Sequence, residues 1–138
     1  MPSQDPESST ILIAERDQSV RKLQELFLKR AGFTVDFADD GREALERAVL
    51  DPPALVITEI LIPTLDGLAL CRRLREDPRT RGTPIIVFSI LAASQRASEA
   101  GATAFLRKPL VDSIFVAAVN DLIAAQPTKA VEEQWASR

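Results

Sequence analysis

Five short apolar runs alternate along the chain with longer segments in which apolar residues recur every three or four positions. The short runs are typical of strands buried in a sheet, and the three-to-four spacing predicts amphipathic helices. Strands that alternate with helices favour a parallel sheet, because each crossover needs a segment of helical length. The sequence therefore predicts a doubly wound α/β domain with five strands. We expect these strands at residues 10–14, 34–38, 55–58, 85–88 and 103–106.

The five predicted helices are bounded by capping residues, glycine and proline. Asp17 or Ser19 is suited to cap the first helix, and Gly32 is suited to end it. In that helix the spacing assigns Val20, Leu23, Phe27 and Ala31 to the buried face. We expect the helices at residues 18–31, 41–50, 67–76, 92–100 and 111–125.

Length and composition indicate one domain with a tail at each end. The chain has 138 residues, of which 46% are hydrophobic and 27% charged, as in ordinary globular proteins. The domain is expected to cover residues 10–125, with a disordered polar tail at 1–9 and a second tail at 126–138. No apolar run approaches the roughly 20 residues of a membrane span, and residues 1–9 lack a signal-peptide core. We therefore expect a cytoplasmic protein without membrane contact.

The balance of charges and the missing residue types exclude several classes of function. A net charge of −3 and a pI near 5.0 argue against a nucleic-acid surface. The absence of histidine excludes a His-based triad, a His metal site and a phosphohistidine carrier. The single Cys71 cannot form an internal disulfide and is expected in the core. An arginine cluster, interpreted as a solvated helix end, comprises Arg72, Arg73, Arg75, Arg79 and Arg81.

Polar side chains follow four of the predicted strands at the point where each strand ends. In open α/β sheets the carboxyl ends of the strands form the ligand-binding edge. The topology is therefore expected to gather these polar groups into one shallow pocket, although a solvated loop acid is the plain alternative for each acid alone. The residues are Glu15, Arg16, Glu59, Ser89 and Lys108.

Several further residues stand at fixed places around these strand ends: Pro63 and Gly67 after Glu59, Ser89 after the fourth strand, Ala100-Gly101-Ala102, and Lys108-Pro109. With this pattern, residues 10–125 resemble a response-regulator receiver domain of two-component signalling, in which Glu59 stands at the acceptor position and Ser89 at the hydroxyl position. The resemblance implies a flavodoxin-like fold with strand order 2-1-3-4-5. It also implies a signalling module rather than an enzyme, with a histidine kinase or a downstream effector as partner.

The centre of the site departs from the receiver pattern at two positions. Glu59 stands where the family carries its phosphoacceptor Asp, and Arg16 stands where the family carries a metal-binding acid. The extra methylene displaces the carboxylate by roughly 1–1.5 Å, and Arg16 removes an oxygen ligand and repels Mg²⁺. Glu15 and Glu59 would remain as vestigial metal ligands. We therefore expect no cofactor, weak Mg²⁺ binding at most, and signalling that does not depend on phosphorylation.

Three hypotheses describe how such a site works. An ion pair between Arg16 and Glu59, shared by Lys108, would lock the domain in one signalling state. Alternatively, the site has decayed and its charges are held by ordinary surface pairing worth no more than about 1 kcal/mol. In the third hypothesis, Glu59 or Asp66 accepts phosphate from a histidine kinase. A flavin site is disfavoured because Glu15 and Asp17 repel phosphate in the loop after the first strand. An acid/base pair of Glu15 and Glu59 is disfavoured because Arg16 beside them would keep both carboxylates ionised.

Two further features bear on partners. The resemblance assigns Phe105 to the family's switch aromatic, and here we expect Phe105 to be fully buried. The last helix carries more apolar residues than one packing face needs, which indicates a partner or a homodimer. Its core stripe is expected to contain Val111, Ile114, Phe115, Ala118 and Leu122, widened by Val116, Val119 and Ile123.

Overall fold

The computed structural model describes residues 10–125, in which five parallel strands form one sheet. The strand order β2-β1-β3-β4-β5 confirms the predicted topology. The predicted tails at 1–9 and 126–138 lie outside the described residues. Among the described residues, no helix is long and apolar enough to span a membrane. The strands are β1 (Thr10–Ala14), β2 (Thr34–Ala38), β3 (Leu55–Thr58), β4 (Ile85–Ser89) and β5 (Ala104–Arg107).

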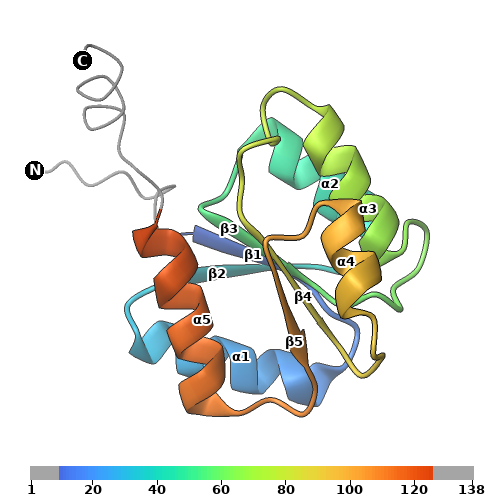
Figure 1. Ribbon diagram of the computed structural model, residues 1–138. Helices are drawn as coiled ribbons and strands as arrows, with labels where there is room; N and C mark the ends of the chain where they lie inside the picture. The colour runs from blue at the N-terminus through green and yellow to red at the C-terminus, as the bar shows by residue number, and fades with distance from the viewer. Residues whose placement is uncertain (1–9, 126–138) are drawn as a thin grey trace, which may run out of the picture.

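Helices cover both faces of the sheet (Figure 1). Helices α1 (Gln18–Arg30) and α5 (Asp112–Ala124) lie on one face. Helices α2 (Gly41–Leu50), α3 (Gly67–Glu76) and α4 (Ser94–Ala100) lie on the other. The predicted bounds agree to within two residues, and Asp17, not Ser19, caps α1 by accepting the N–H groups of Ser19 and Val20.

The sheet separates two apolar cores, because the three central strands are buried on both sides. On the α1/α5 face, the rings of Phe88 and Phe115 lie 5.8 Å apart between centroids. On the opposite face, Cys71 packs among buried side chains of α2, α3 and α4, as predicted. Burial raises the pKa of the Cys71 thiol to about 11, so this residue is a core residue and not a reactive thiol.

The buried face of α1 differs from the prediction. Leu23 is 43% exposed and Ala31 is exposed, whereas Gln24 and Leu28 are fully buried. A hydrophobic pattern cannot detect a polar residue at the centre of a packing face. Val20 and Phe27 are partly buried against the core, as predicted, so the prediction was wrong for the other two residues and missed the buried glutamine.

Gln24 is a site where stability should rise on substitution. Neither its Nε2 nor its Oε1 has a hydrogen-bond partner among residues 10–125. A buried unsatisfied amide costs about 1–3 kcal/mol, and methionine has a similar length and helix propensity. We expect Gln24→Met to raise the free energy of unfolding by about 1–2 kcal/mol, measured by urea denaturation. The exposed Gln18→Met is the control, and an equal or lower stability of Gln24→Met would contradict the prediction.

The packing face of α5 also differs from the prediction. Phe115 and Val119 are the buried residues, while Val111 and Ile114 are 46% and 57% exposed. Val111 is the N-cap residue and Ile114 lies in the first turn, so both sit at the end of α5 that follows the β5–α5 loop. Excess apolar surface is present, but it lies at the start of α5.

Arg75 was assigned to a solvated helix end, and this assignment was wrong. Its Nε donates to the carbonyl of Gly101 at 2.8 Å, and its Nη1 donates to the carbonyls of Arg81 and Thr83 at 2.9 and 2.6 Å. Its Nη2 contacts the Thr103 hydroxyl at 3.2 Å. Arg75 therefore joins α3 to the loops that flank β4 and β5.

Candidate functional site

The carboxyl ends of β1, β3, β4 and β5 meet at one edge of the sheet and bring four polar side chains together. Glu59 lies between Ser89 and Lys108, and Lys108 also reaches Glu15. Glu15, Glu59 and Ser89 are buried, although all three are polar. The structure therefore places four of the five predicted site residues in one cluster.

The Glu59 carboxylate is the centre of this cluster. Its Oε2 accepts the backbone N–H of Ile60 at 2.5 Å and that of Leu61 at 3.2 Å, together with the hydroxyl of Ser89. Its Oε1 lies 3.0 Å from the Lys108 Nζ. Two amides, one hydroxyl and one ammonium thus converge on a single carboxylate.

Lys108 holds two carboxylates at once. Its Nζ lies 3.1 Å from Glu15 Oε1 and 3.0 Å from Glu59 Oε1, and it sits 5.4 Å from the centre of the Phe88 ring. Burial by itself lowers the pKa of Lys108, but hydrogen bonds with Glu59 and Glu15 outweigh burial and raise it. Burial by itself raises the pKa of Glu59, but hydrogen bonds from Ser89 and Lys108 outweigh burial and lower it. Both groups are therefore charged at neutral pH.

The loop after β3 returns to Glu59 and depends on a glycine. The N–H of Gly67 donates to the Ile60 carbonyl at 2.9 Å, and a Cβ at Gly67 would lie 2.3 Å from the Glu59 carbonyl oxygen. Only glycine permits so close an approach. The neighbouring Asp66 is exposed and caps α3 by accepting the N–H of Ala69 at 2.8 Å. Its carboxylate is thus engaged away from the cluster.

Ser89 connects Glu59 to two further segments. Its hydroxyl, which donates to Glu59, also accepts the N–H of Leu91 at 3.3 Å. Its carbonyl accepts the N–H of Lys108 at 2.8 Å. The position of the β4–α4 loop therefore depends on the group that Ser89 contacts at position 59.

Arg16 does not join the cluster, so the predicted ion pair between Arg16 and Glu59 is wrong. Arg16 is exposed, and among the described residues no carboxylate lies within 4.0 Å of its guanidinium. Glu15 and Arg16 are consecutive residues in the loop that follows β1, which ends at Ala14. Glu15 pairs with Lys108, whereas Arg16 lines a surface cavity beside the cluster.

The family model described as the response regulator receiver domain matches residues 11–120. The chain belongs to this family. Among curated relatives of the receiver domain, the response regulator PleD of Caulobacter vibrioides is 32% identical over 118 residues, covering 83% of this chain and 26% of PleD. The transcriptional regulatory protein CseB of Streptomyces coelicolor is 33% identical over 116 residues, covering 82% of this chain and 48% of CseB. The chain thus spans about a quarter to a half of these relatives.

Solved structures support the same assignment. A putative response regulator from Chloroflexus aurantiacus superposes on this receiver domain with a TM-score of 0.80 at 34% identity. That match covers 84% of this chain and 98% of the other. The receiver domain of a signal transduction histidine kinase from Syntrophus aciditrophicus gives a TM-score of 0.80 at 31% identity, covering 89% and 96%.

The residues of this receiver domain fit a divalent cation poorly. Among the described residues, no group of three or more His, Cys, Asp or Glu side chains is arranged to hold a metal ion. The two acids that remain, Glu15 and Glu59, both face the Lys108 ammonium. Mg²⁺ needs several oxygen ligands in octahedral geometry, and a cation already stands between these carboxylates.

Phe105 is half-buried, and the expectation of full burial was wrong. It packs at the margin of the core that includes α3 and α4. β5 is an edge strand, so no further strand covers the side of Phe105 away from β4.

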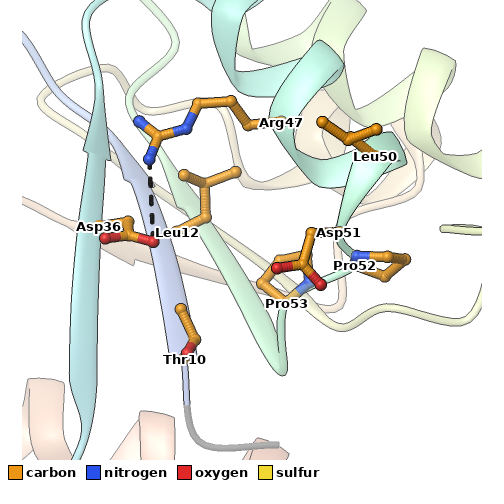
Figure 2. Close-up of a pocket in the computed structure, with 8 residues that line it drawn as sticks. All are labelled: Thr10, Leu12, Asp36, Arg47, Leu50, Asp51, Pro52 and Pro53. Carbon is orange, nitrogen blue, oxygen red and sulfur yellow. Dashed lines mark ion pairs between the residues drawn. The ribbon is translucent and has the colours of Figure 1, made fainter. Parts of the chain in front are cut away.

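A separate cavity of about 150 Å³ lies at the other end of the sheet (Figure 2). Thr10 begins β1 there, and Pro52 and Pro53 precede β3. The Asp36 Oδ2 and the Arg47 Nη2 lie 3.8 Å apart at its rim. None of the predicted site residues lines this cavity, so it is distinct from the Glu59 cluster.

Sequence reasoning missed the backbone part of the site and the second arginine near Arg16. The amides of Ile60 and Leu61 carry no signal in residue identity, because every residue except proline has an N–H group. Arg96, which shares the cavity with Arg16, lies within an alanine-rich segment without any motif. Only the fold brings these groups to the same edge.

Proposed function

We propose that this receiver domain is a signalling module held in a single state by Glu59, without phosphoryl transfer. The observation that carries the proposal is the saturation of Glu59, whose carboxylate engages the Ile60 and Leu61 amides, the Ser89 hydroxyl and the Lys108 ammonium. These are donors of the kind that would stabilise an added phosphoryl group. An internal carboxylate occupies all four.

Burial favours a held state over a decayed one. The Glu59 and Lys108 side chains are only 7% and 13% exposed, whereas pairs that contribute little are solvent-exposed. Removing one partner of a buried pair leaves an uncompensated charge, which is strongly destabilising. Loss of either Glu59 or Lys108 should therefore destabilise the domain, whereas loss of one partner of an exposed surface pair would not.

The same contacts favour independence from a metal ion and from a kinase as phosphoryl donor. We propose that the Lys108 ammonium is the resident cation between Glu15 and Glu59, so that Mg²⁺ has no free pair of carboxylates. Asp66 is a poor substitute acceptor because its carboxylate caps α3 outside the cluster. The domain then acts through contacts with other signalling proteins, and nucleic acid is not proposed as a direct partner.

The held state predicts a specific effect of Glu59→Ala. Without the carboxylate, the N–H of Leu61 loses its acceptor and the Ser89 hydroxyl loses the group that orients it toward Leu91. Hydrogen bonds to charged groups contribute about 1.5–3 kcal/mol, so we expect amide hydrogen exchange at Leu61 and Leu91 to accelerate at least about tenfold. NMR exchange rates measure this effect residue by residue.

The exposed Glu46→Ala is the matched control and should leave both exchange rates unchanged. Unchanged exchange at Leu61 and Leu91 in Glu59→Ala would support the decayed site and refute the held state. Spectra of the native chain with Mg²⁺ and acetyl phosphate are expected to show no saturable change. A saturable change that reached Lys108 would instead support a working phosphoacceptor.

A further inference from the structure

A cavity of about 460 Å³ opens beside the Glu59 cluster, where loops after three strands meet. Arg16 comes from the β1–α1 loop, Leu61 from the β3–α3 loop, and Leu91 from the β4–α4 loop. Arg96 contributes a second guanidinium from α4. Apolar side chains therefore form much of the lining, and two cations stand among them.

Both arginines are available for a ligand. Arg16 and Arg96 are exposed, and among the described residues neither has a carboxylate within 4.0 Å. The one acid in the lining, Asp66, is engaged as the cap of α3. Capping leaves the negative charge of Asp66 in place, so two guanidinium groups and one carboxylate give the lining a net positive charge, although the whole chain has a net charge of −3.

The cavity also offers apolar surface. Leu61 is 53% exposed, and Leu68 and Leu91 are partly exposed. Exposed apolar side chains grouped in a cavity differ from scattered single exposures, because a ligand can bury them together. A ligand that matches this surface needs both a bulky apolar group and negative charge.

The cavity lining is tied to the Glu59 cluster by hydrogen bonds. Glu59 holds the amides of Ile60 and Leu61, and Ser89 holds the amide of Leu91. Ile60, Leu61 and Leu91 all line the cavity. A change of the side chain at position 59 would therefore alter the hydrogen bonds that hold the β3–α3 and β4–α4 loops, which both line the cavity.

We propose that this cavity binds a partner protein through an acidic segment that carries a bulky apolar side chain. Arg16 and Arg96 pair with carboxylates of the segment, and Leu61, Leu68 and Leu91 receive its apolar side chain. The inference rests on the proposed function in one respect, since it takes the Glu59 cluster to hold the cavity in its binding shape. In this proposal Arg16 binds a partner protein and does not form the ion pair with Glu59 that the sequence suggested.

The test is an NMR titration of the full chain with the peptide acetyl-Glu-Glu-Leu-Glu-Trp-Glu-amide. We expect saturable shifts centred on the amides of Leu61, Leu68 and Leu91. Exposed ion pairs contribute about 0.2–1 kcal/mol each, so replacing both arginines by Ser should weaken binding about two- to thirtyfold. Because both arginines are exposed, the Arg16→Ser/Arg96→Ser chain should keep the native spectrum elsewhere.

Two control peptides separate the contributions. Gln in place of every Glu should weaken binding as much as loss of the arginines, and Ala in place of Leu and Trp should abolish it. The controls Arg42→Ser and Arg72→Ser, at exposed arginines outside the cavity, should leave binding unchanged. Absent shifts, shifts centred elsewhere, or equal binding by the Gln peptide would each overturn the proposal.

Glu59→Ala distinguishes failure of this proposal from failure of the proposed function. We call the cavity lined by Arg16 and Arg96 the docking cavity. Weaker peptide binding by Glu59→Ala would support both peptide binding at the docking cavity and control of that binding by Glu59. If Glu59→Ala bound the peptide as the native chain does, with the arginine dependence intact, the docking cavity would stand and its control by Glu59 would be refuted. If native binding were absent while exchange at Leu61 and Leu91 still accelerated in Glu59→Ala, the docking cavity alone would fall.

Discussion

Replacing both Glu59 and Arg16 by Asp is expected to make the chain accept a phosphoryl group from acetyl phosphate at least about 100-fold faster than the native chain does. The shorter side chain withdraws the carboxylate by roughly 1.5 Å, one carbon–carbon bond length. Withdrawal releases the Ser89 hydroxyl, the Leu61 amide and the Lys108 ammonium from the contacts they make with Glu59. Those donors then become available to the phosphoryl oxygens, whose charge they stabilise.

The second substitution supplies the oxygen ligand that Arg16 lacks. With Glu15 and the carboxylate at position 59, a carboxylate at position 16 gives three acidic side chains at the same edge of the sheet. We therefore expect saturable Mg²⁺ binding by the double variant in an NMR titration. Arg16→Asp alone tests whether Mg²⁺ binds while the Glu59 carboxylate still occupies the Ser89, Leu61 and Lys108 hydrogen-bond donors.

The measurement is the rate at which intact mass increases by one phosphoryl group in acetyl phosphate and Mg²⁺. In the reaction, the phosphorus–oxygen bond to the acetyl group breaks, a new bond to a carboxylate oxygen at position 59 forms, and acetate leaves. Glu59→Asp alone should give an intermediate rate. Phosphorylation of the native chain at the rate of the double variant would show that the substitutions at positions 59 and 16 do not block the chemistry, and would refute the proposed function.

The fold could be predicted from the sequence because its signals are local and repeated. Each strand is a short apolar run, and most helices begin or end at a cap, a glycine or a proline, as at Asp17, Gly67 and Pro78. Alternation of strands and helices then restricts the topology to a few arrangements. The convergence of Glu15, Glu59, Ser89 and Lys108 follows from that topology, since each ends or follows a strand.

The direction of individual polar side chains could not be predicted in this way. Arg16 was expected to face Glu59, but Lys108 approaches from β5 and pairs with both Glu59 and Glu15. Once that pairing is formed, burial of a second cation would add a desolvation cost without a free carboxylate to offset it. Such competition between residues from distant segments leaves no trace in spacing or composition.

Gln24 and Arg75 show the same limit in the core. The inward packing of both residues was missed because polar residues were assigned to the surface, which is correct for most of them. Gln24 lies at the centre of the α1 packing face, and Arg75 reaches carbonyl groups 6 to 26 residues away. Its partners are backbone atoms, which no sequence motif marks.

Arg75→Ala is expected to lower the free energy of unfolding by about 2–4 kcal/mol, because several hydrogen bonds to a charged donor are lost together. The guanidinium donates to the carbonyls of Gly101, Arg81 and Thr83, of which the Thr83 contact, at 2.6 Å, is the shortest. Thr83 is buried, so its carbonyl would remain without that donor in the variant. For a domain of this size the midpoint of thermal unfolding should fall by on the order of 10 °C.

The geometry of the arginine side chain, more than its charge, is expected to account for this stability. Arg75 lies within 4.0 Å of no carboxylate among the described residues, so its donors serve neutral acceptors on two separate loops, one before β4 and one before β5. Lysine offers one ammonium in place of a planar fork and cannot reach these acceptors simultaneously. Arg75→Lys should therefore lose most of what Arg75→Ala loses, while the exposed Arg72→Ala should change stability by less than about 0.5 kcal/mol. Native stability in Arg75→Lys would show that the charge or the aliphatic stem, and not the forked hydrogen bonding, joins α3 to the loops around β4 and β5.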